Sequence, residues 1–530
     1  MTMTIINNQM RPIFLFVFFI IFSQSCLAQN DEWEKALEEL KLSKYYVDNK
    51  EFASATIHIE SSVEIIKQKM MYLSQYYSYK EKYMMWQQMS KIFHDIYPSV
   101  ISLSPTKNSI EELYNTILFS KNFMIPGCKD MSTSYDWKLI EKRLTGNDVA
   151  IEFLDVDNFF ISDTTNTIIY ALIIRKGQSP KMLKLFDYYE FVDAFTNRRN
   201  TARKVLGEMI WTPIIKDIGN INNIYFSPTN IFEQIPIEYL PVDEWKSISD
   251  KYNLYRLSST NMLTLNPPKR IYKKAVLYGG LNYEGMENYG RNHNTNIRSG
   301  FDYLNNTKEE IDTICGIMQE KDIKFKAFTG TKGTETSLKE ISKQEFDILH
   351  IATHGMYVKS EQADSIAKLL NINFLHPNSN DNTIDEDSVL MRSFLVMAGG
   401  NRLIYRQSTT HDENDGLLTA AEIALLELSD VDIVTLSACD SGIGEWNTDG
   451  IIGLQRAFKR AGVKTILMSF SKVDDEATKI LMIEFYKNLM EGKSKYQSFK
   501  NAQKYLREVD NGKYEAPEYW EPFVMLDGLN

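Results

Sequence analysis

The strongest constraint on the fold is a pair of apolar runs that flank a segment with a helical pattern. The first run, residues 433–436, is β-branched and is followed within three residues by Cys439; the second covers residues 463–468. A buried strand, a helix and a second buried strand form the βαβ unit of a parallel sheet. Reacting groups lie at the carboxyl ends of the strands in such sheets, and we expect Cys439 there.

A second strand pattern ends at a histidine. Residues 346–353 read FDILHIAT, and His354 and Gly355 follow directly. Because the carboxyl ends of parallel strands meet at one edge of a sheet, we expect Cys439 and His354 to face each other there. A thiol beside an imidazole is what a cysteine nucleophile and its general base require. The two residues are therefore the candidate catalytic pair.

These segments resemble the CHAT domain family, the caspase-like, TPR-associated peptidase relatives of separase, caspases and gingipains. The resemblance runs from about residue 137 to residue 530 and rests on FSPTNIFEQIPIEYL, YRLSST, HIATHG, VTLSACDSG, DGIIGLQRAFKRAGVKTIL, KVDDEAT and YWEPFVMLDG, in that order. It implies an α/β caspase-like three-layer sandwich with a mainly parallel sheet, in which a pseudo-protease half precedes an active half. Ser471 departs from the family pattern, which usually has tryptophan there; this removes an apolar wall beside the expected cleft.

The resemblance also implies the chemistry. A cysteine endopeptidase would form an acyl-thioester at Cys439, with His354 as base and then acid. The backbone N–H groups of Gly355 and Cys439 would form the oxyanion hole, and the missing Cβ of Gly355 lets its N–H approach a substrate closely. Asp440 would either make the S1 pocket prefer Arg or Lys, or only cap the loop. This chemistry needs no metal and no organic cofactor.

Two rival functions stay open at this point. An idle Cys–His pair would leave a caspase-like binding or scaffold protein, because a fold does not guarantee activity. An acyl or peptidyl transferase would use the same thioester and would differ only in whether an amine replaces water. His350 could form a metal pair with His354, but a third ligand and an HExxH motif are missing, so a supporting or core role is expected.

The N-terminal residues have the proportions of a secretion signal. Arg11 precedes an apolar stretch at residues 13–22, which is too short to span a bilayer comfortably. Cys26 and Ala28 are small residues that suit cleavage before Gln29. An uncleaved anchor and a lipoprotein are the alternatives. We expect residues 1–28 to be a signal peptide and the mature protein to be exported, periplasmic or extracellular, without an integral membrane span.

Without Cys26, three cysteines remain in the chain: Cys128, Cys315 and Cys439. An odd number in an exported protein implies at least one free thiol or an intermolecular bond. A free, reactive Cys439 fits this count. Cys315 lies in a helical pattern and is expected to be a buried structural thiol.

The rest of the 530 residues suggests three further structural regions. Residues 29–130 read as long helices with a weak TPR-like match at Phe52 and Ala55. Residues 137–262 contain strand patterns but no cysteine or histidine, and agree with the pseudo-protease half. Residues 268–530 alternate strands and helices and would be the active half. The strands are expected at residues 150–153, 168–174, 182–186, 222–226, 275–279, 325–328 and 347–352, besides the two runs above.

The helices of the last region have recognisable ends. They are expected at residues 308–319, 337–342, 420–428, 450–461 and 475–489. Asp449 is the predicted N-cap of the helix after the nucleophile, and Gly462 its predicted stop. Asp474 or Asp475 is expected to cap the last of these helices rather than to form a catalytic carboxylate pair.

The charge balance limits the partners. Lys and Arg number 59 against 70 Asp and Glu, a net charge of −11, and the two signs are interspersed. No basic stripe is present to neutralise phosphates, which argues against binding to nucleic acid or an anionic membrane. The expected partners are a protein or peptide substrate and a regulatory protein on residues 29–130.

Overall fold

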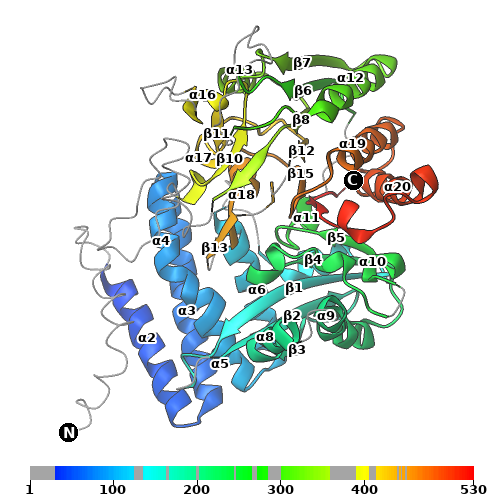
Figure 1. Ribbon diagram of the computed structural model, residues 1–530. Coiled ribbons are helices and arrows are strands. Elements are labelled where there is room, and N and C mark those ends of the chain that lie inside the picture. Colours follow the sequence, from blue (N-terminus) through cyan, green and yellow to red (C-terminus); the bar gives the residue numbers. More distant parts are fainter. Residues whose placement is uncertain are drawn as a thin grey trace.

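The computed structural model describes residues 30–124, 135–162, 166–197, 202–243, 246–265, 271–284, 300–358, 389–404, 414–438, 441–442, 444–447 and 450–529. The signal predicted at residues 1–28 lies outside this part, and so does Cys128. One eleven-stranded sheet runs through the molecule, with helices on both faces and a helical region at the N-terminal side (Figure 1).

The N-terminal region is all-α and TPR-like, as predicted. Its first two helices form a hairpin in which Ser43 Oγ donates to the carbonyl of Ala55 at 3.0 Å and Ser62 Oγ to that of Ala36 at 2.8 Å. Ala55 is fully buried, so the expected small packing position is a helix–helix contact. The helices are α2 (Asn30–Asp48), α3 (Phe52–Ser74), α4 (Tyr79–Lys91), the π-helix η1 (Ile92–Ile96), α5 (Tyr97–Leu103) and α6 (Lys107–Phe123).

The first half of the sheet is covered on one face by this helical region. In β1 (Asp148–Asp157), Ala150 and Leu154 belong to the core shared with the N-terminal helices, whereas Ile151 and Phe153 pack with α9 (Ala202–Ile218). This alternation follows from the two-residue period of a strand. The other elements are α7 (Trp137–Arg143), β2 (Thr167–Arg175), β3 (Lys181–Asp187), α8 (Tyr188–Asn197), β4 (Asn223–Ser227), η2 (Asn230–Glu233), η3 (Ile237–Tyr239), α10 (Ile248–Lys251), β5 (Asn253–Arg256) and α11 (Met262–Leu265).

The second half is a mainly parallel sheet between two helix layers. Figure 1 shows α12, α19 and α20 on one side and α13, α17 and α18 on the other. The strands are β6 (Lys274–Leu281), β7 (Lys324–Gly330), β8 (Ile348–Ala352), β12 (Ile433–Ser437), β15 (Thr465–Ser469) and β16 (Phe523–Leu526). The helices are α12 (Asn305–Glu320), α13 (Glu335–Ile341), α16 (Asn401–Ile404), α17 (Ala420–Ile423), α18 (Leu454–Arg460), α19 (Asp475–Met490), α20 (Lys495–Glu508), η4 (Val509–Asn511) and η5 (Pro517–Tyr519).

The two halves form one continuous sheet. The strand order is β3-β2-β1-β4-β5-β16-β15-β12-β8-β6-β7. The pairs β3–β2, β2–β1 and β16–β15 are antiparallel, and the others are parallel. The halves meet between β5 and β16, where the ladder consists of a single residue pair, Arg256 and Leu526.

Two small sheets lie outside the large one and correct part of the prediction. One contains β9 (Gly355–Tyr357), β10 (Ser393–Val396) and β11 (Leu417–Thr419), and the other pairs β13 (Gly444–Asn447) with β14 (Gly450–Gly453). Residues 450–453 are therefore a strand, and the helix predicted from residue 450 begins only at Leu454, with Gly453 as N-cap. The capping role predicted for Asp449 is thus wrong, and Asp449 itself lies outside the described residues.

Other helix ends are closer to expectation. Gly462 has φ +100° directly after α18, a left-handed conformation that glycine adopts without strain, and it ends the helix as predicted. Asp474 caps α19, because its side chain accepts the N–H of Ala477 at 2.8 Å. The helix predicted at residues 420–428 is shorter and ends at Ile423.

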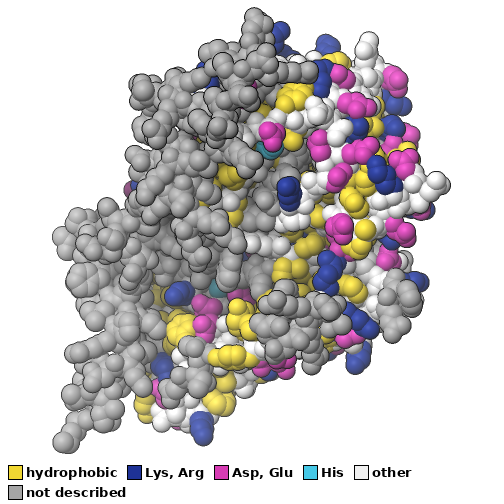
Figure 2. Space-filling view, in the orientation of Figure 1, with side chains coloured by type: hydrophobic (Ala, Val, Ile, Leu, Met, Phe, Trp, Pro, Cys, Tyr) yellow, Lys and Arg dark blue, Asp and Glu magenta, His cyan; other side chains and the backbone are white. Residues whose placement is uncertain are grey.

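The surface of the described residues is mixed in charge. Figure 2 shows acidic and basic side chains mingled along the α19 and α20 side of this face. Among the helices that the structure describes, none combines the length and apolarity needed to cross a bilayer. In the same part of the chain, no three or more His, Cys, Asp or Glu residues come together as metal ligands would.

The contact between the helical region and β1 is expected to depend on pH. Asp95, in η1, is half-buried; burial and the charge of Asp155 on β1 raise its pKa to about 7, with Asp157 and Lys91 nearby. Since an unfolded aspartate has a pKa of about 3.9, the unfolded state releases this proton first, and stability falls as the pH rises from about 4 to about 7.

Asp95→Asn removes this dependence. We expect the variant to match the wild type below about pH 4 and to gain up to about 4 kcal/mol over it by pH 7, with no further gain above. Urea unfolding of both proteins between pH 4 and pH 8.5 measures the difference. A difference in unfolding free energy that is constant across this range would contradict the assignment.

Candidate active site

The expected catalytic residues follow two neighbouring parallel strands. In the ladder between β8 and β12, Ala352 pairs with Ser437, and Thr353 N–H donates to the Ser437 carbonyl at 3.2 Å. His354 is the second residue after β8. Cys439, the second residue after β12, lies outside the described residues, and so does Asp440. The structure shows that the ends of β8 and β12 lie side by side. The roles of Cys439 and Asp440 stay predictions.

His354 is oriented by a backbone carbonyl. Its Nε2 lies 2.7 Å from the carbonyl oxygen of Asp302. A carbonyl can only accept, so Nε2 carries the proton, and in the neutral ring Nδ1 is then free to accept one. The rings of Tyr283 and Phe301 contact the imidazole at centroid distances of 5.1 and 5.5 Å and also contact each other at 6.5 Å. The half-buried His354 is thus held in one tautomer and packs against a pair of aromatic rings.

Asn401, at the start of α16, joins the two segments that surround His354. Its Oδ1 accepts the Phe301 N–H at 2.7 Å, and its Nδ2 donates to the Phe301 carbonyl at 3.0 Å and to Glu284 Oε1 at 2.9 Å. Its own N–H donates to the Tyr283 carbonyl at 2.9 Å. Asn401 is only 1% exposed, so these bonds are shielded from water.

The turn at His354 is fixed on both sides. Thr353 Oγ1 donates to the Val396 carbonyl and lies 3.0 Å from the Tyr283 hydroxyl. Burial raises the pKa of Tyr283 to about 12, so this hydroxyl stays protonated. Val396 N–H donates to the His354 carbonyl at 2.9 Å, next to the pairing of Gly355 with Leu395. Gly355 is thereby placed at the start of β9, and its oxyanion role stays a prediction.

Ser469, at the end of β15, anchors both sides of the loop that contains Cys439. On the near side its Oγ donates to the Ala438 carbonyl at 2.8 Å. On the far side its N–H donates to Ser441 Oγ at 3.0 Å, and its carbonyl accepts the Gly442 N–H at 2.7 Å. A Cβ at Gly442 would lie 2.4 Å from Cδ1 of Phe470, so only glycine lets the loop lie this close to that ring.

A buried polar chain lies behind the site, between the sheet and α12 and α19. His350 is fully buried, with Nδ1 2.6 Å from Thr435 Oγ1 and Nε2 2.9 Å from Glu310 Oε1. Glu310 Oε2 accepts from Ser437 Oγ at 3.1 Å, and Thr435 Oγ1 lies 2.7 Å from the Tyr486 hydroxyl. His350 is therefore a core histidine, as predicted, and it braces the ends of β8 and β12.

The other predicted residues lie away from this edge. Cys315 is half-buried on α12, and burial raises the pKa of its thiol to about 11, which fits an unreactive structural cysteine. Ser471 is exposed beside Phe470. Sequence reasoning gave no role to Asp302, Asn401 or Ser469; of these, only Ser469 lies beside family-like segments, between those that end at residue 467 and begin at residue 472.

The helical region contacts α18, the first helix after Cys439 in the chain. The guanidinium of Arg460 on α18 lies 3.5 Å from the ring centre of Tyr79 on α4, and that of Arg456 lies 5.7 Å from Tyr83. From the first half of the sheet, Gln234 Nε2 donates to the Gly444 carbonyl in β13 at 2.8 Å. Both the helical region and the first half of the sheet therefore touch the elements that follow Cys439.

The solved structures to which this chain is similar include a cysteine proteinase and a separase, both at low sequence identity. The Arg-specific cysteine proteinase gingipain R aligns with a TM-score of 0.36 and 9% identity, over 63% of this chain and 68% of that one. The separase of the Saccharomyces cerevisiae separase–securin complex aligns with a TM-score of 0.45 and 10% identity, over 89% and 41%.

Sequence comparison gives a family. Tetratricopeptide repeat protein 28 of Mus musculus is 32% identical over 110 residues, and that of Homo sapiens is 30% identical over 110 residues. The match covers 21% of this chain but only 4% of either relative. The model of the CHAT domain matches residues 200–528, more than half of the chain. The chain therefore belongs to the CHAT domain family.

Proposed function

We propose that this protein is a cysteine endopeptidase with Cys439 as nucleophile and His354 as general base and acid. The observation that carries the proposal is the hydrogen bond from His354 Nε2 to the Asp302 carbonyl. It leaves Nδ1 as the proton acceptor of the neutral ring, at the sheet edge where β8 and β12 end side by side. Base, orienting group and nucleophile then correspond to a catalytic triad with a backbone carbonyl as its third member.

The proposed reaction needs only groups of this chain and water. His354 Nδ1 takes the proton of the Cys439 thiol, and the thiolate adds to the substrate carbonyl carbon. The N–H groups of Gly355 and Cys439 stabilise the oxyanion. The protonated imidazole then gives its proton to the leaving amine, and the peptide C–N bond breaks. Water, deprotonated by His354, hydrolyses the thioester and restores the thiol.

The anchoring of the nucleophile loop supports this assignment. Ala438 is buried, and its carbonyl accepts a hydrogen bond from Ser469. Because Cys439 is the next residue, its Cα lies only about 3.8 Å from the Cα of this fixed residue. Membership of the CHAT domain family also supports the assignment as a peptidase. The segment at residues 1–28 supports the proposal that the protein is exported. Asp440 is proposed to favour basic P1 residues, and residues 29–130 to bind a regulatory protein, since α4 touches α18.

A peptide-library cleavage assay tests the proposal, with wild type beside Cys439→Ala, His354→Ala and the control Cys315→Ala. We expect the first two substitutions to lower cleavage by at least about 1000-fold and the control to leave it unchanged. Iodoacetamide labelling at pH 7, read out by mass spectrometry, should mark Cys439 far faster than Cys315. Absence of both cleavage and fast labelling would contradict the proposal and favour a binding or scaffold protein.

A further inference from the structure

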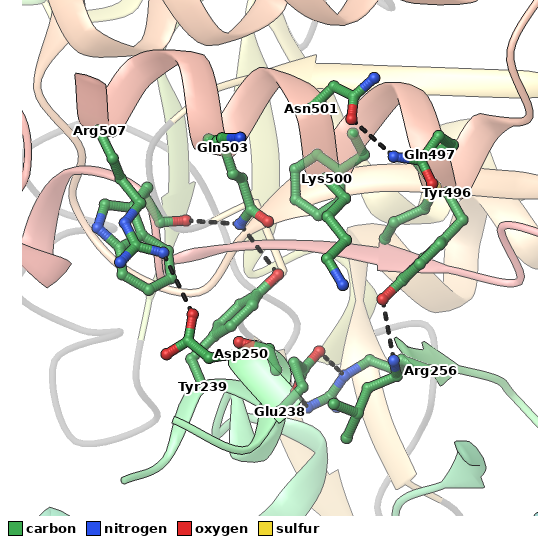
Figure 3. A pocket seen from close by; sticks show the side chains of 16 residues that line it. Glu238, Tyr239, Asp250, Arg256, Tyr496, Gln497, Lys500, Asn501, Gln503 and Arg507 are labelled. Carbon is green, nitrogen blue, oxygen red and sulfur yellow. Dashed lines mark hydrogen bonds and ion pairs between the residues drawn. The ribbon is translucent and has the colours of Figure 1, made fainter. Parts of the chain in front are cut away.

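A pocket of about 400 Å³ opens at the joint between the two halves of the sheet (Figure 3). It arises because β5 and β16 pair at one residue only and then separate. In place of a partner strand, Tyr496 on α20 accepts the Leu254 N–H on its hydroxyl at 2.9 Å. The pocket is therefore enclosed by elements of both halves, namely α20 and Trp520 on one side and η3, α10 and β5 on the other.

The charges in the pocket leave an excess of cations. Glu238 is paired in two hydrogen bonds with Arg256, at 2.9 and 2.6 Å, and Asp250 lies 3.5 Å from Arg507. Both acids of the lining are thus matched by an arginine. Lys500, on α20, adds a positive charge that these paired acids do not balance, whereas the exposed Lys504, one turn further on, lies 3.9 Å from Glu508.

Lys500 points its ammonium group into this space (Figure 3). It is half-buried, and its Nζ donates to the neutral Oδ1 of Asn253 at 2.9 Å. Among the described residues, no carboxylate lies within 4.0 Å of it; the lysine pairs that the structure shows involve other residues. A partly desolvated ammonium without an anionic partner gains from a bound anion.

The lining also contains aromatic rings that are held in place. The rings of Tyr239 and Trp520 meet edge to face with centroids 5.4 Å apart. Gln503 fixes both, because its Nε2 donates to the Tyr239 hydroxyl at 3.0 Å and to the Trp520 carbonyl at 3.1 Å. A flat apolar ring can pack against such a surface while a charged group on it reaches Lys500.

We propose that this pocket binds a small organic anion, a carboxylate or phosphate group on an aromatic ring, and that binding acts on the nucleophile loop. The link is Arg256, whose guanidinium lies 5.3 Å from the ring centre of Phe226 and 5.2 Å from that of Phe470. Phe470 packs on Gly442, three residues after Cys439. A ligand that holds α20 and β5 closer together would thereby restrict the loop that contains Cys439. This effect on the loop rests on the proposed function.

Binding is tested on the full chain with three probes: benzoate, its neutral isostere benzamide, and acetate, which lacks the ring. Calorimetric titration at low salt should show benzoate binding at least about 10-fold more tightly than either of the others. Lys500→Gln should lower benzoate affinity about 10-fold, and the exposed control Lys324→Gln should not change it. Equal affinity for benzoate and benzamide, or an unchanged Lys500→Gln variant, would overturn the anion site. Phenyl phosphate, tested in the same way, tells a phosphate preference from a carboxylate preference.

The regulatory part has a separate measurement. Saturating benzoate should change the rate of Cys439 labelling by iodoacetamide several-fold in the wild type and not in Lys500→Gln. An unchanged rate despite proven binding would overturn the link to the loop. Benzoate binding is also measured on Cys439→Ala, so that it can be judged independently of activity. A wild-type protein that binds benzoate but cleaves no peptide contradicts only the proposed peptidase function. A protein that cleaves peptides but does not bind benzoate contradicts only the proposed anion pocket.

Discussion

Asn401→Ala is expected to lower kcat for peptide cleavage by about 100-fold while changing KM little. Asn401 makes four hydrogen bonds to the segments that carry Tyr283, Glu284 and Phe301, which surround the imidazole of His354. Without them the Asp302 carbonyl and both rings can move relative to His354, and misplacement of a catalytic group by about 1 Å costs on the order of 100-fold in rate.

The kinetic measurement is a full kcat and KM determination at a temperature where circular dichroism shows both proteins folded. Asn49→Ala is the matched control, because Asn49 also bonds a backbone carbonyl, that of Tyr45 at 2.8 Å, but on an exposed helix end of the N-terminal region. A kcat for Asn401→Ala within about twofold of the control would show that Asn401 does not position the base.

Glu238→Ala is expected to lower the free energy of unfolding by about 3–5 kcal/mol. Glu238 and Arg256 are 5% and 3% exposed, and arginine stays charged, so the substitution leaves a buried cation without its carboxylate. The carbonyls of Phe232 and Ile235, which also accept from Arg256, cannot neutralise it.

Urea unfolding provides the test, with Asp312→Ala as control, since the Lys308–Asp312 pair is exposed and should contribute less than about 1 kcal/mol. The double variant Glu238→Leu with Arg256→Met should recover much of the loss, because it removes both charges together. If Glu238→Ala costs no more than Asp312→Ala, the pair does not support the joint of the sheet.

Much of the sheet could be predicted because its central strands are apolar in themselves. β8, β12 and β15 lie within or next to the predicted runs, since a strand covered on both faces has a continuous hydrophobic pattern. β5 and β16 have four residues each, and their pairing joins positions more than half of the chain apart. No local pattern encodes such a contact. The helix predicted over residues 450–461 is too long at its N-terminal end. The sequence of residues 450–453 is compatible with either a helix or a strand, and their pairing with β13 makes them a strand.

The site could be predicted only where side-chain chemistry leaves a signature. His354 and His350 stand in a family-like motif; the burial of His350 confirms its core role, and the catalytic role of His354 stays a prediction. Asp302 contacts His354 through its backbone carbonyl. Because every residue has such a carbonyl, the residue type at position 302 does not predict this contact. Asn401 lies far along the chain from the segments it joins. Cys439 and Asp440 lie outside the described residues, and their roles stay predictions.

The position of β16 in the sheet has a consequence for how the protein is made. This strand lies between β5 and β15 but follows the ten other strands of the sheet in sequence. During synthesis the edges of β5 and β15 that face each other therefore have no partner strand until residues 523–526 leave the ribosome. Phe470 likewise gains its hydrogen bond to the Pro522 carbonyl only then. The loop that contains Cys439, which Phe470 touches at Gly442, therefore gains this part of its support only late in translation.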